Sequence, residues 1–153
     1  MVTVSTGDLP KEVADQHGIG VVPIYINFDG ESYLDGIDLS RQAFYARLPD
    51  MNPSPTTAVP GPGLFLQTYQ RLIDEGATEI LSVHVSRELS GVVDVAQLAA
   101  RDASVPVTVV DSGSLSLGLG FLAQAAAEAA ANGSSKSEIM TLIDEQRRRT
   151  HVF

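Results

Sequence analysis

The sequence predicts an α/β fold in which a parallel sheet of about four to five strands is flanked by helices. First, β-branched, apolar segments alternate along the chain with segments whose apolar residues recur at helical spacing. Second, glycine, proline and asparagine separate these segments, as expected where helices end and turns form. Third, the 153 residues are 44% apolar and 19% charged, a balance typical of one globular domain with a hydrophobic core.

The amino-terminal segment predicts a short strand and a short helix. Residues 2–4 are all β-branched, which favours a strand. Asp8 is a good N-cap, so we expect it to cap a helix over residues 9–17 that has Pro10 in its first turn. Gly18 is expected to end that helix.

The next segment predicts a strand, a hairpin and a helix. Residues 19–28 are β-branched and aromatic, which predicts one strand in which Pro23 marks a bulge or an edge. An Asp-Gly turn signal follows, so residues 32–34 are expected to form a short hairpin arm. Ser40 is expected to cap the helix after it.

Proline dominates residues 49–63, which contain five prolines and two glycines. Proline lacks the backbone donor that helices and sheets require, so no regular element is expected here. The segment is interpreted as an ordered functional loop or a linker.

The rest of the chain returns to alternating elements. Residues 64–76 predict a helix that ends at its final glycine, and residues 80–86 predict a strand. A helix over residues 90–102 follows. Residues 105–110 are nearly all β-branched and predict a buried parallel strand.

Two helices are expected after the last buried strand, over residues 114–131 and 135–149. Gly118 and Gly120 lie inside the first of them and lack the third glycine of a dinucleotide-binding turn. Tight helix packing therefore explains them better. Residues 151–153 predict the beginning of another strand.

Charge and composition exclude several classes of function. Nineteen acidic residues against ten Lys and Arg give a net charge of -9, so nucleic acid is not an expected partner. The chain has no cysteine and no histidine pair at metal-ligand spacing, so we expect no metal and no cofactor. The chain shows neither a signal peptide nor the roughly 20 apolar residues of a membrane span, which predicts a cytoplasmic protein.

Hydroxyl side chains gather where three predicted strands end, and again in the proline-rich segment. Ligands of open α/β sheets bind at the carboxyl ends of the strands. Hydroxyls and free amides at helix N-termini suit a carboxylate or a phosphate. The candidates are Thr3, Ser5 and Thr6; Ser86, Ser90 and Gly91; Ser112 and Ser114; and Ser54, Thr56 and Thr57.

Helix capping is the plain alternative, since Ser and Thr are among the commonest N-caps. Asp8 and Ser40 are assigned entirely to capping. Ser90 stays open between a cap and a ligand-binding role, because Gly91 beside it lets a ligand approach the backbone closely.

A hydrolase is another alternative. Strand alternation places Ser82, His84 and Ser86 on one face, so a triad of Ser86 or Ser90 with His84 and Asp111 is conceivable. Against it, neighbours on one strand rarely have nucleophile–base geometry, and the chain has no Gly-x-Ser-x-Gly motif.

Aromatic side chains could line an apolar tunnel or simply fill the core. Burying a sixteen-carbon tail at about 0.8 kcal/mol per CH₂ yields on the order of 10 kcal/mol, enough for tight binding after ordering costs. A lipid site is therefore physically possible. The aromatic candidates are Tyr25, Phe28, Phe44, Phe65, Tyr69 and Phe121.

Five stretches, in order, resemble the DegV family, the fatty-acid-binding subunits of a two-component bacterial fatty acid kinase. They are Val-Thr-Val-Ser-Thr-Gly-Asp-Leu-Pro at residues 2–10, Phe-Asp-Gly-Glu-Ser-Tyr within 23–38, Pro-Thr-Thr-Ala-Val-Pro at 55–60, Leu-Ser-Gly within 81–91, and Val-Asp-Ser with Leu-Gly-Phe within 110–121. The resemblance implies that residues 1–153 form an amino-terminal lipid-binding domain, and that the family's carboxy-terminal domain is absent.

The resemblance also implies a function. Thr57 and Ser90 would bind the carboxyl of a long-chain fatty acid, with Thr56, Ser86 and Gly91 beside them. The bound acid would be presented to a separate, ATP-binding fatty acid kinase subunit, so the chain itself would not be an enzyme.

The chain departs from the family pattern at Val4 and at Ala58 and Val59, where the family has polar residues. Two other functions therefore stay open. One is a truncated structural lobe without a working ligand site. The other is a small hydrolase or phosphotransferase that uses Ser90 and His84.

Overall fold

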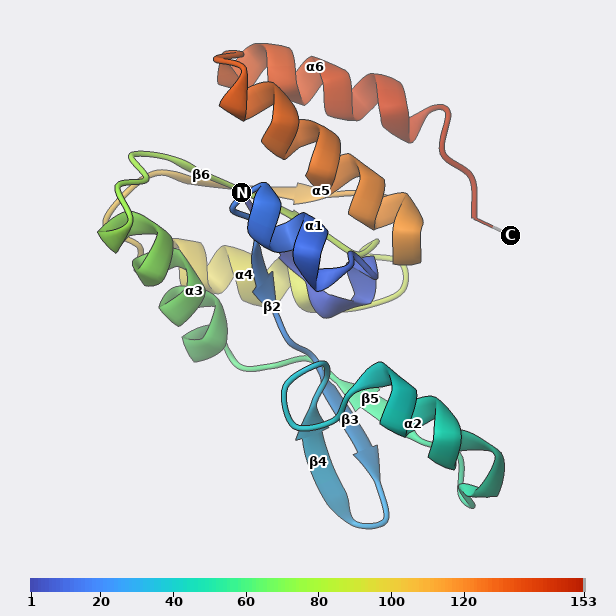
Figure 1. Cartoon of the computed structure of the whole chain (residues 1–153). Coiled ribbons are helices and arrows are strands. Elements are labelled where there is room, and N and C mark those ends of the chain that lie inside the picture. The colour runs from blue at the N-terminus through green and yellow to red at the C-terminus, as the bar shows by residue number, and fades with distance from the viewer. Residues whose placement is uncertain (153) are drawn as a thin grey trace.

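A four-stranded parallel sheet forms the centre of the larger part of the molecule, as predicted (Figure 1). The computed structural model describes residues 1–152. The strand order is β2-β1-β6-β7, formed by Gly20–Val22, Val2–Val4, Ile80–His84 and Val107–Asp111. Every residue of β6 is buried, as expected of a central parallel strand with helices over both faces.

Helices cover both faces of this sheet, which gives three layers (Figure 1). On one face α3 (Pro62–Asp74) packs against β2, and α4 (Val92–Ala100) packs against β6 and β7. On the other face α5 (Ser116–Ala131) packs against β1 and β6, with α6 (Lys136–Arg147) on its outer side. The short helix α1 (Lys11–Gln16) lies on the α5 side and buries Ala14 in a small cluster with Ala127 of α5. We call this assembly the lobe.

A smaller unit projects from one end of the lobe (Figure 1). It contains a three-stranded antiparallel sheet in the order β4-β3-β5, formed by Glu31–Leu34, Tyr25–Phe28 and Thr56–Ala58. The helix α2 (Arg41–Arg47) and the 3₁₀ turn η2 (Leu48–Asp50) complete it. We call residues 25–58 the module.

The lobe and the module have separate hydrophobic cores. The lobe core joins side chains from the sheet and from α3 to α6, and its largest fully buried members are Tyr69, Phe65, Ile80, Leu119, Leu122 and Ile143. The module core is small and consists of Ile26, Phe28 and Leu39, with Tyr33, Phe44 and Met51 packed against it.

The single strand predicted over residues 19–28 is in fact two strands in two sheets. β2 ends at Val22, and β3 begins at Tyr25 after Pro23 and Ile24. Proline has no amide to donate to a sheet ladder, so the parallel pairing of β2 with β1 stops there. The predicted hairpin arm is confirmed as β4, which pairs antiparallel with β3.

The prediction that residues 49–63 contain no regular element is wrong. Thr56, Thr57 and Ala58 form β5, which pairs with Asn27, Ile26 and Tyr25 of β3. The prolines lie outside these three residues, so the backbone donors of the strand are intact. Pattern reading misses so short a strand among prolines.

The assignment of Asp8 to helix capping is also wrong. α1 begins at Lys11 after Pro10, which provides no side-chain cap. Asp8 instead follows the 3₁₀ turn η1 (Ser5–Gly7), in the left-handed region at φ 54°. Ser40, by contrast, caps α2 as predicted, because its hydroxyl accepts the amide of Ala43.

The strand predicted over residues 151–153 is not present in its described part. His151 and Val152 adopt no regular structure, and Phe153 lies outside the described residues. Within residues 1–152, no helix combines the length and the hydrophobicity that crossing a bilayer requires.

Candidate functional site

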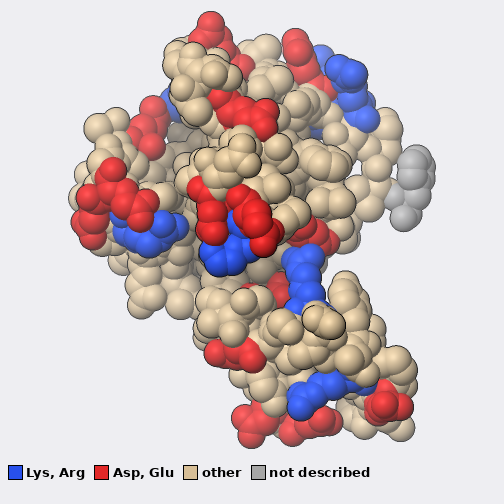
Figure 2. Space-filling model, viewed as in Figure 1, with Lys and Arg blue, Asp and Glu red and all other residues tan. Residues whose placement is uncertain are grey.

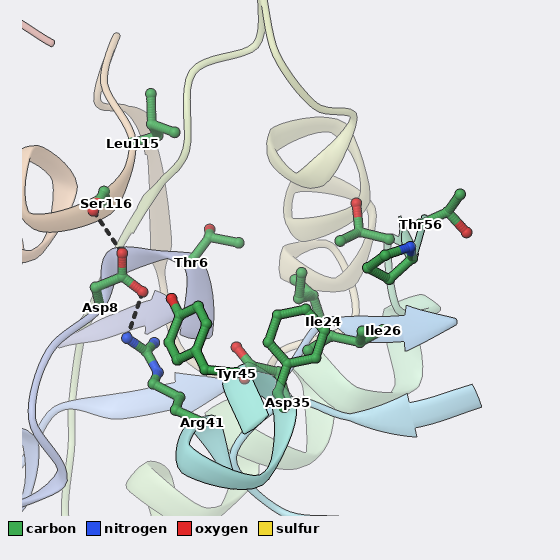
Figure 3. A pocket seen from close by; sticks show the side chains of 13 residues that line it. Thr6, Asp8, Ile24, Ile26, Asp35, Arg41, Tyr45, Thr56, Leu115 and Ser116 are labelled. Atoms are coloured by element: carbon green, nitrogen blue, oxygen red, sulfur yellow. Dashed lines mark hydrogen bonds and ion pairs between the residues drawn. The ribbon is translucent and has the colours of Figure 1, made fainter. Parts of the chain in front are cut away.

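A pocket of about 360 Å³ opens where the module meets the lobe (Figure 3). The lobe contributes residues from η1 and from the start of α5, and the module contributes residues from α2 and β5. The carboxyl end of β1 leads directly into η1. The pocket therefore lies at one of the strand ends where the sequence places hydroxyl side chains.

Apolar side chains form much of the pocket wall. Ile24 comes from the segment between β2 and β3, Ile26 from β3, Phe44 from α2, and Leu115 is the residue before α5. Ile24 and Ile26 are buried, whereas Leu115 is 37% exposed. Most of the remaining lining residues are polar and include Asp8, Asp35 and Arg41, so the pocket offers both apolar surface for an acyl chain and hydrogen-bonding groups.

Thr56 and Thr57 bring two hydroxyls to the same pocket. Their position is set by β5, because Thr57 pairs with Ile26 and Thr56 pairs with Asn27 of β3. Both residues are exposed, and neither hydroxyl bonds to any residue that the structure describes. They are therefore available as hydrogen-bond donors to a ligand.

Asp8, Arg41 and Ser116 form a charged corner of the pocket (Figure 3). Asp8 Oδ1 lies 2.6 Å from Arg41 Nη1, and the Ser116 hydroxyl donates to Asp8 Oδ2 at 2.5 Å. Arg41 Nη2 also donates to the carbonyl oxygen of Ser5 at 3.0 Å. Both oxygens of the Asp8 carboxylate therefore have partners.

The second predicted group of site residues lies on the turn between β6 and α4. Ser86 is buried, and its hydroxyl accepts the amide of Glu88, so it has a structural role in this turn. Ser90 is half-buried, and its hydroxyl has no partner among residues 1–152. Gly91 is exposed, with open space where a Cβ would lie, so a ligand could approach its backbone.

The structure therefore brings together only part of the predicted site. Thr56 and Thr57 line the pocket at the junction, whereas Ser86, Ser90 and Gly91 are not among its lining residues. The joint action of Thr57 and Ser90 on one carboxyl group stays a prediction.

Two hydroxyls at the other hydroxyl-rich junctions, those of Ser5 and Ser112, form hydrogen bonds within the fold. Ser5 Oγ accepts the amide of Ile24, and Ser112 Oγ bonds to both the amide and the carbonyl of Ser114. The hydroxyls of Thr3 and Thr6 are buried without a partner in the described chain. Of these residues Thr6, Thr56 and Thr57 line the junction pocket, so the structure favours these three as ligand donors.

The proposed Ser–His–Asp triad finds no support in the geometry. His84 is completely buried, and its Nε2 atom lies 2.7 Å from the hydroxyl of Ser82. Burial lowers the pKa of His84 to about 3, so the ring is neutral at pH 7. The carboxylate of Asp111 accepts the amides of Arg87 and Gly113.

The aromatic side chains divide between core and pocket. Phe65 and Tyr69 are fully buried in the lobe core, and Phe28 is buried in the module core. Phe44 lines the pocket. Phe121 is 57% exposed on α5. Of the aromatic candidates for a lipid tunnel, Phe44 is the one that this pocket uses.

Sequence reasoning missed Tyr45, Arg41 and Ser116 as pocket residues. Arg41 had a detectable signal, because a positive charge in the first turn of a helix opposes the helix dipole and so suggests a tertiary partner. Ser116 had no such signal, since its position beside Asp8 depends on the packing of α5 against η1.

Comparison with known proteins gives consistent matches along the chain. Residues 1–153 match the family model described as "Uncharacterised protein, DegV family". A DegV domain-containing protein from Streptomyces coelicolor is 39% identical over all of this chain and 54% of its own length. A DegV domain-containing protein from Staphylococcus aureus is 35% identical over the same shares.

Solved structures show the same arrangement of elements. A DegV family protein from Thermus thermophilus, whose structure is described in terms of fatty acid binding, superposes with a TM-score of 0.87 at 35% identity, covering 96% of this chain and 52% of that one. DegV from Bacillus subtilis, described as a fatty acid binding protein, gives a TM-score of 0.87 at 32% identity over the same shares. The chain thus spans about half the length of the relatives it matches.

Proposed function

The chain belongs to the DegV family, and on that premise we propose that it binds a long-chain fatty acid and presents the carboxyl group to a separate, ATP-dependent fatty acid kinase subunit. One observation carries the proposal most directly. The junction pocket combines apolar side chains with the hydroxyls of Thr6, Thr56 and Thr57, which have no partner among the described residues.

The chemistry of an acyl carboxylate fits this combination. Ile24, Ile26, Phe44 and Leu115 offer apolar surface to the first carbons of the chain. The Thr57 hydroxyl donates to one carboxylate oxygen, and the Ser90 hydroxyl, which has no partner within residues 1–152, donates to the other. Hydrogen bonds to a charged group contribute roughly 1.5–3 kcal/mol each, more than neutral ones.

The pocket volume sets the extent of the site within this chain. A cavity of about 360 Å³ lies at the small end of the roughly 300–1,000 Å³ range of ligand sites, so we expect it to hold the head group and part of a long tail. The remaining carbons lie against surface beyond this pocket. The chain spans about half the length of its relatives, so its action together with a kinase subunit is proposed and is tested separately.

Binding is tested by expressing the chain in bacteria, extracting it with organic solvent and measuring the affinity of the emptied protein for palmitate and oleate. We expect a co-purifying fatty acid and saturable binding. Thr57→Val and Ser90→Ala should each weaken binding by roughly 10- to 100-fold, which corresponds to one lost hydrogen bond to a charged group.

Thr141→Val is the matched control, because Thr141 lies on the surface of α6 and its hydroxyl bonds within the helix. This variant should bind like the parent. A protein that stays empty with both fatty acids would instead support the structural lobe without a working site.

The kinase partner requires its own measurement. A purified ATP-dependent fatty acid kinase subunit should form acyl phosphate from labelled ATP only when the loaded chain is added. Equal product with free fatty acid alone would remove the presenting role and leave the binding role intact.

A further inference from the structure

The module and the lobe meet across a narrow junction. Their cores are separate, and the elements that pack extensively on one another lie either within the lobe or within the module. Figure 1 shows the module joined to the lobe through the segment after β2 and the segment before α3. Apolar packing between the two units is therefore slight, and polar contacts carry more weight in setting their orientation.

Arg41 supplies two of the polar contacts across this junction. Its guanidinium binds the carboxylate of Asp8 at 2.6 Å and the carbonyl oxygen of Ser5 at 3.0 Å (Figure 3). The amide of Ile24 donates to Ser5 Oγ at 3.1 Å in the segment that enters the module. Figure 2 shows basic and acidic side chains side by side where the two units meet.

The partner of Arg41 is held in place from the lobe side. Asp8 has a left-handed backbone conformation that is uncommon for residues other than glycine. Its second carboxylate oxygen accepts the hydroxyl of Ser116, which also has a positive φ of 52°. Asp8 and Ser116, both in uncommon backbone conformations, thus hold the Asp8 carboxylate so that its Oδ1 atom faces Arg41.

Arg41 also stands between two hollows. It lines the junction pocket, and it lines a second hollow of about 750 Å³ that includes Lys11, Ile37 and Arg71. Asp8 also lines both hollows. The Asp8–Arg41 pair is therefore part of the wall that separates them.

We infer that Arg41 is a positioning residue that latches the module onto the lobe and so fixes the place of β5 relative to the lobe. The consequence for the ligand rests on the proposed function. Thr57 belongs to the module and Ser90 to the lobe, so the separation of these two hydroxyls depends on the orientation that Arg41 holds. Loss of the latch lets the module move and lets the fatty acid leave faster.

The latch is tested by a distance measurement between the two units. The chain has no cysteine, so spin labels placed with Glu31→Cys on β4 and Arg101→Cys after α4 are unique. Pulsed dipolar spectroscopy of this labelled chain should give one narrow distance distribution. Arg41→Gln and Asp8→Asn should broaden it, and Arg41→Lys should give an intermediate width, because lysine keeps the charge but not the two-armed geometry.

Arg47→Gln is the matched control. Arg47 lies on the same helix, but its guanidinium lies over the ring of Phe28, inside the module. Its removal should leave the distribution narrow. A distribution that stays narrow in Arg41→Gln, or that broadens equally in Arg47→Gln, would overturn the latch.

The ligand measurement separates this inference from the proposed function. In stopped-flow displacement of a fluorescent fatty acid, Arg41→Gln should raise the dissociation rate by roughly two- to fivefold, the range expected for one partly exposed ion pair. If the parent chain binds no fatty acid but Arg41→Gln still broadens the distance distribution, the proposed function is refuted and the latch is kept. If the parent chain binds fatty acid but the distance distribution stays narrow in Arg41→Gln, the latch is refuted and the proposed function is kept.

Discussion

A chain of polar side chains runs through the lobe core at the scale of single residues. The hydroxyl of Tyr69 lies 3.0 Å from that of Ser82, which lies 2.7 Å from Nε2 of His84, and all three residues are fully buried. The Nδ1 atom of His84 has no partner within the described residues, and its ring packs edge-on against Phe65. An imidazole in these surroundings is stable only in its neutral form.

This histidine predicts a specific loss of stability in acid. The pKa of His84 is about 3 in the folded chain, against 6.5 when exposed. Below pH 6.5 the unfolded chain therefore binds a proton that the folded chain does not, so stability falls as the pH drops from 6.5 towards 3. We expect His84 to account for a loss of about 2.5 kcal/mol in unfolding free energy between pH 7 and pH 4.5.

Urea unfolding of the parent and of His84→Gln at both pH values measures this contribution. The variant should lose about 2.5 kcal/mol less than the parent over this interval, whatever its stability at pH 7. Other titrating groups are common to both proteins and cancel in the difference. Parallel pH profiles would show that His84 is accessible to protons in the folded chain.

Close backbone approach decides the packing of α5 at the scale of elements. A Cβ on Gly120 would lie 2.3 Å from the carbonyl oxygen of Gly7 in η1, which is backbone and cannot yield easily. α5 therefore rests directly on the turn that leads to Asp8. The interpretation of Gly120 as a packing glycine is confirmed by this backbone contact, whereas the nearest atom to a Cβ on Gly118 is the side-chain hydroxyl of Ser114.

Two alanine substitutions should have opposite effects. Gly120→Ala should destabilise the chain by roughly 1–3 kcal/mol, because the added methyl group forces α5 away from η1. Gly63→Ala in the first turn of α3 should be neutral or stabilise by up to about 1 kcal/mol, because open space surrounds the site and alanine favours a helix.

Thermal and urea unfolding of the two variants provide the comparison. Gly120→Ala should also weaken fatty acid binding, because η1 carries Thr6 and leads to Asp8 at the pocket. Equal stability of the two variants would mean that the contact between α5 and η1 tolerates a methyl group.

Two units of unequal size, each with its own hydrophobic core, make up the molecule as a whole. The module core contains only three buried side chains, whereas the lobe core spans a sheet and four helices. Small cores offer little stability of their own, so units of this kind open locally at lower free energy than large ones. The module should therefore be the first part of the chain to unfold.

Phe28→Ala should unfold the module and leave the lobe folded. Phe28 is buried and stacks on Tyr33 with ring centroids 4.7 Å apart. Removing its ring costs roughly 3–5 kcal/mol, more than so small a core can sustain. Amide hydrogen exchange should then be fast in β3, β4 and β5 and still slow in β6 and β7, and fatty acid binding should be lost with β5.

Phe65→Ala is the counterpart in the lobe, where it removes a fully buried ring of the larger core. Phe65→Ala should lower the protection of amides in both the lobe and the module, because β3 and β5 are connected to segments that leave the lobe. Uniform loss of protection throughout the chain in Phe28→Ala would show that module and lobe unfold as one unit.

Much of the fold follows from local patterns. A few adjacent residues are enough to identify the β-branched runs at β1, β6 and β7, the glycines at positive φ after α1 and α3, and the Ser40 cap. Local rules therefore predicted the parallel sheet and most of the helices. The same rules failed at β5, because three residues between prolines carry too little periodicity to indicate a strand.

The pocket was predicted in part. Its two threonines belong to a motif that stands out in the sequence, whereas the ligand roles of Thr57 and Ser90 came from resemblance and stay predictions. Arg41 was not expected at the pocket, and Asp8 was expected only as a cap. The charge of Arg41 in the first turn of α2 suggests a tertiary partner, but no local pattern identifies Asp8 as that partner.

Composition, periodicity and turn residues thus specify the alternation of strands and helices, the hydroxyl-bearing segments and the acidic surface from the chain alone. The division into lobe and module, and the corner where Asp8 meets Arg41 and Ser116, arise only in three dimensions. The physical reason is separation along the chain: Arg41 bonds to a residue 36 positions away, and Ser116 to one 108 positions away. Such contacts depend on the path of the whole backbone, which no short window of sequence contains.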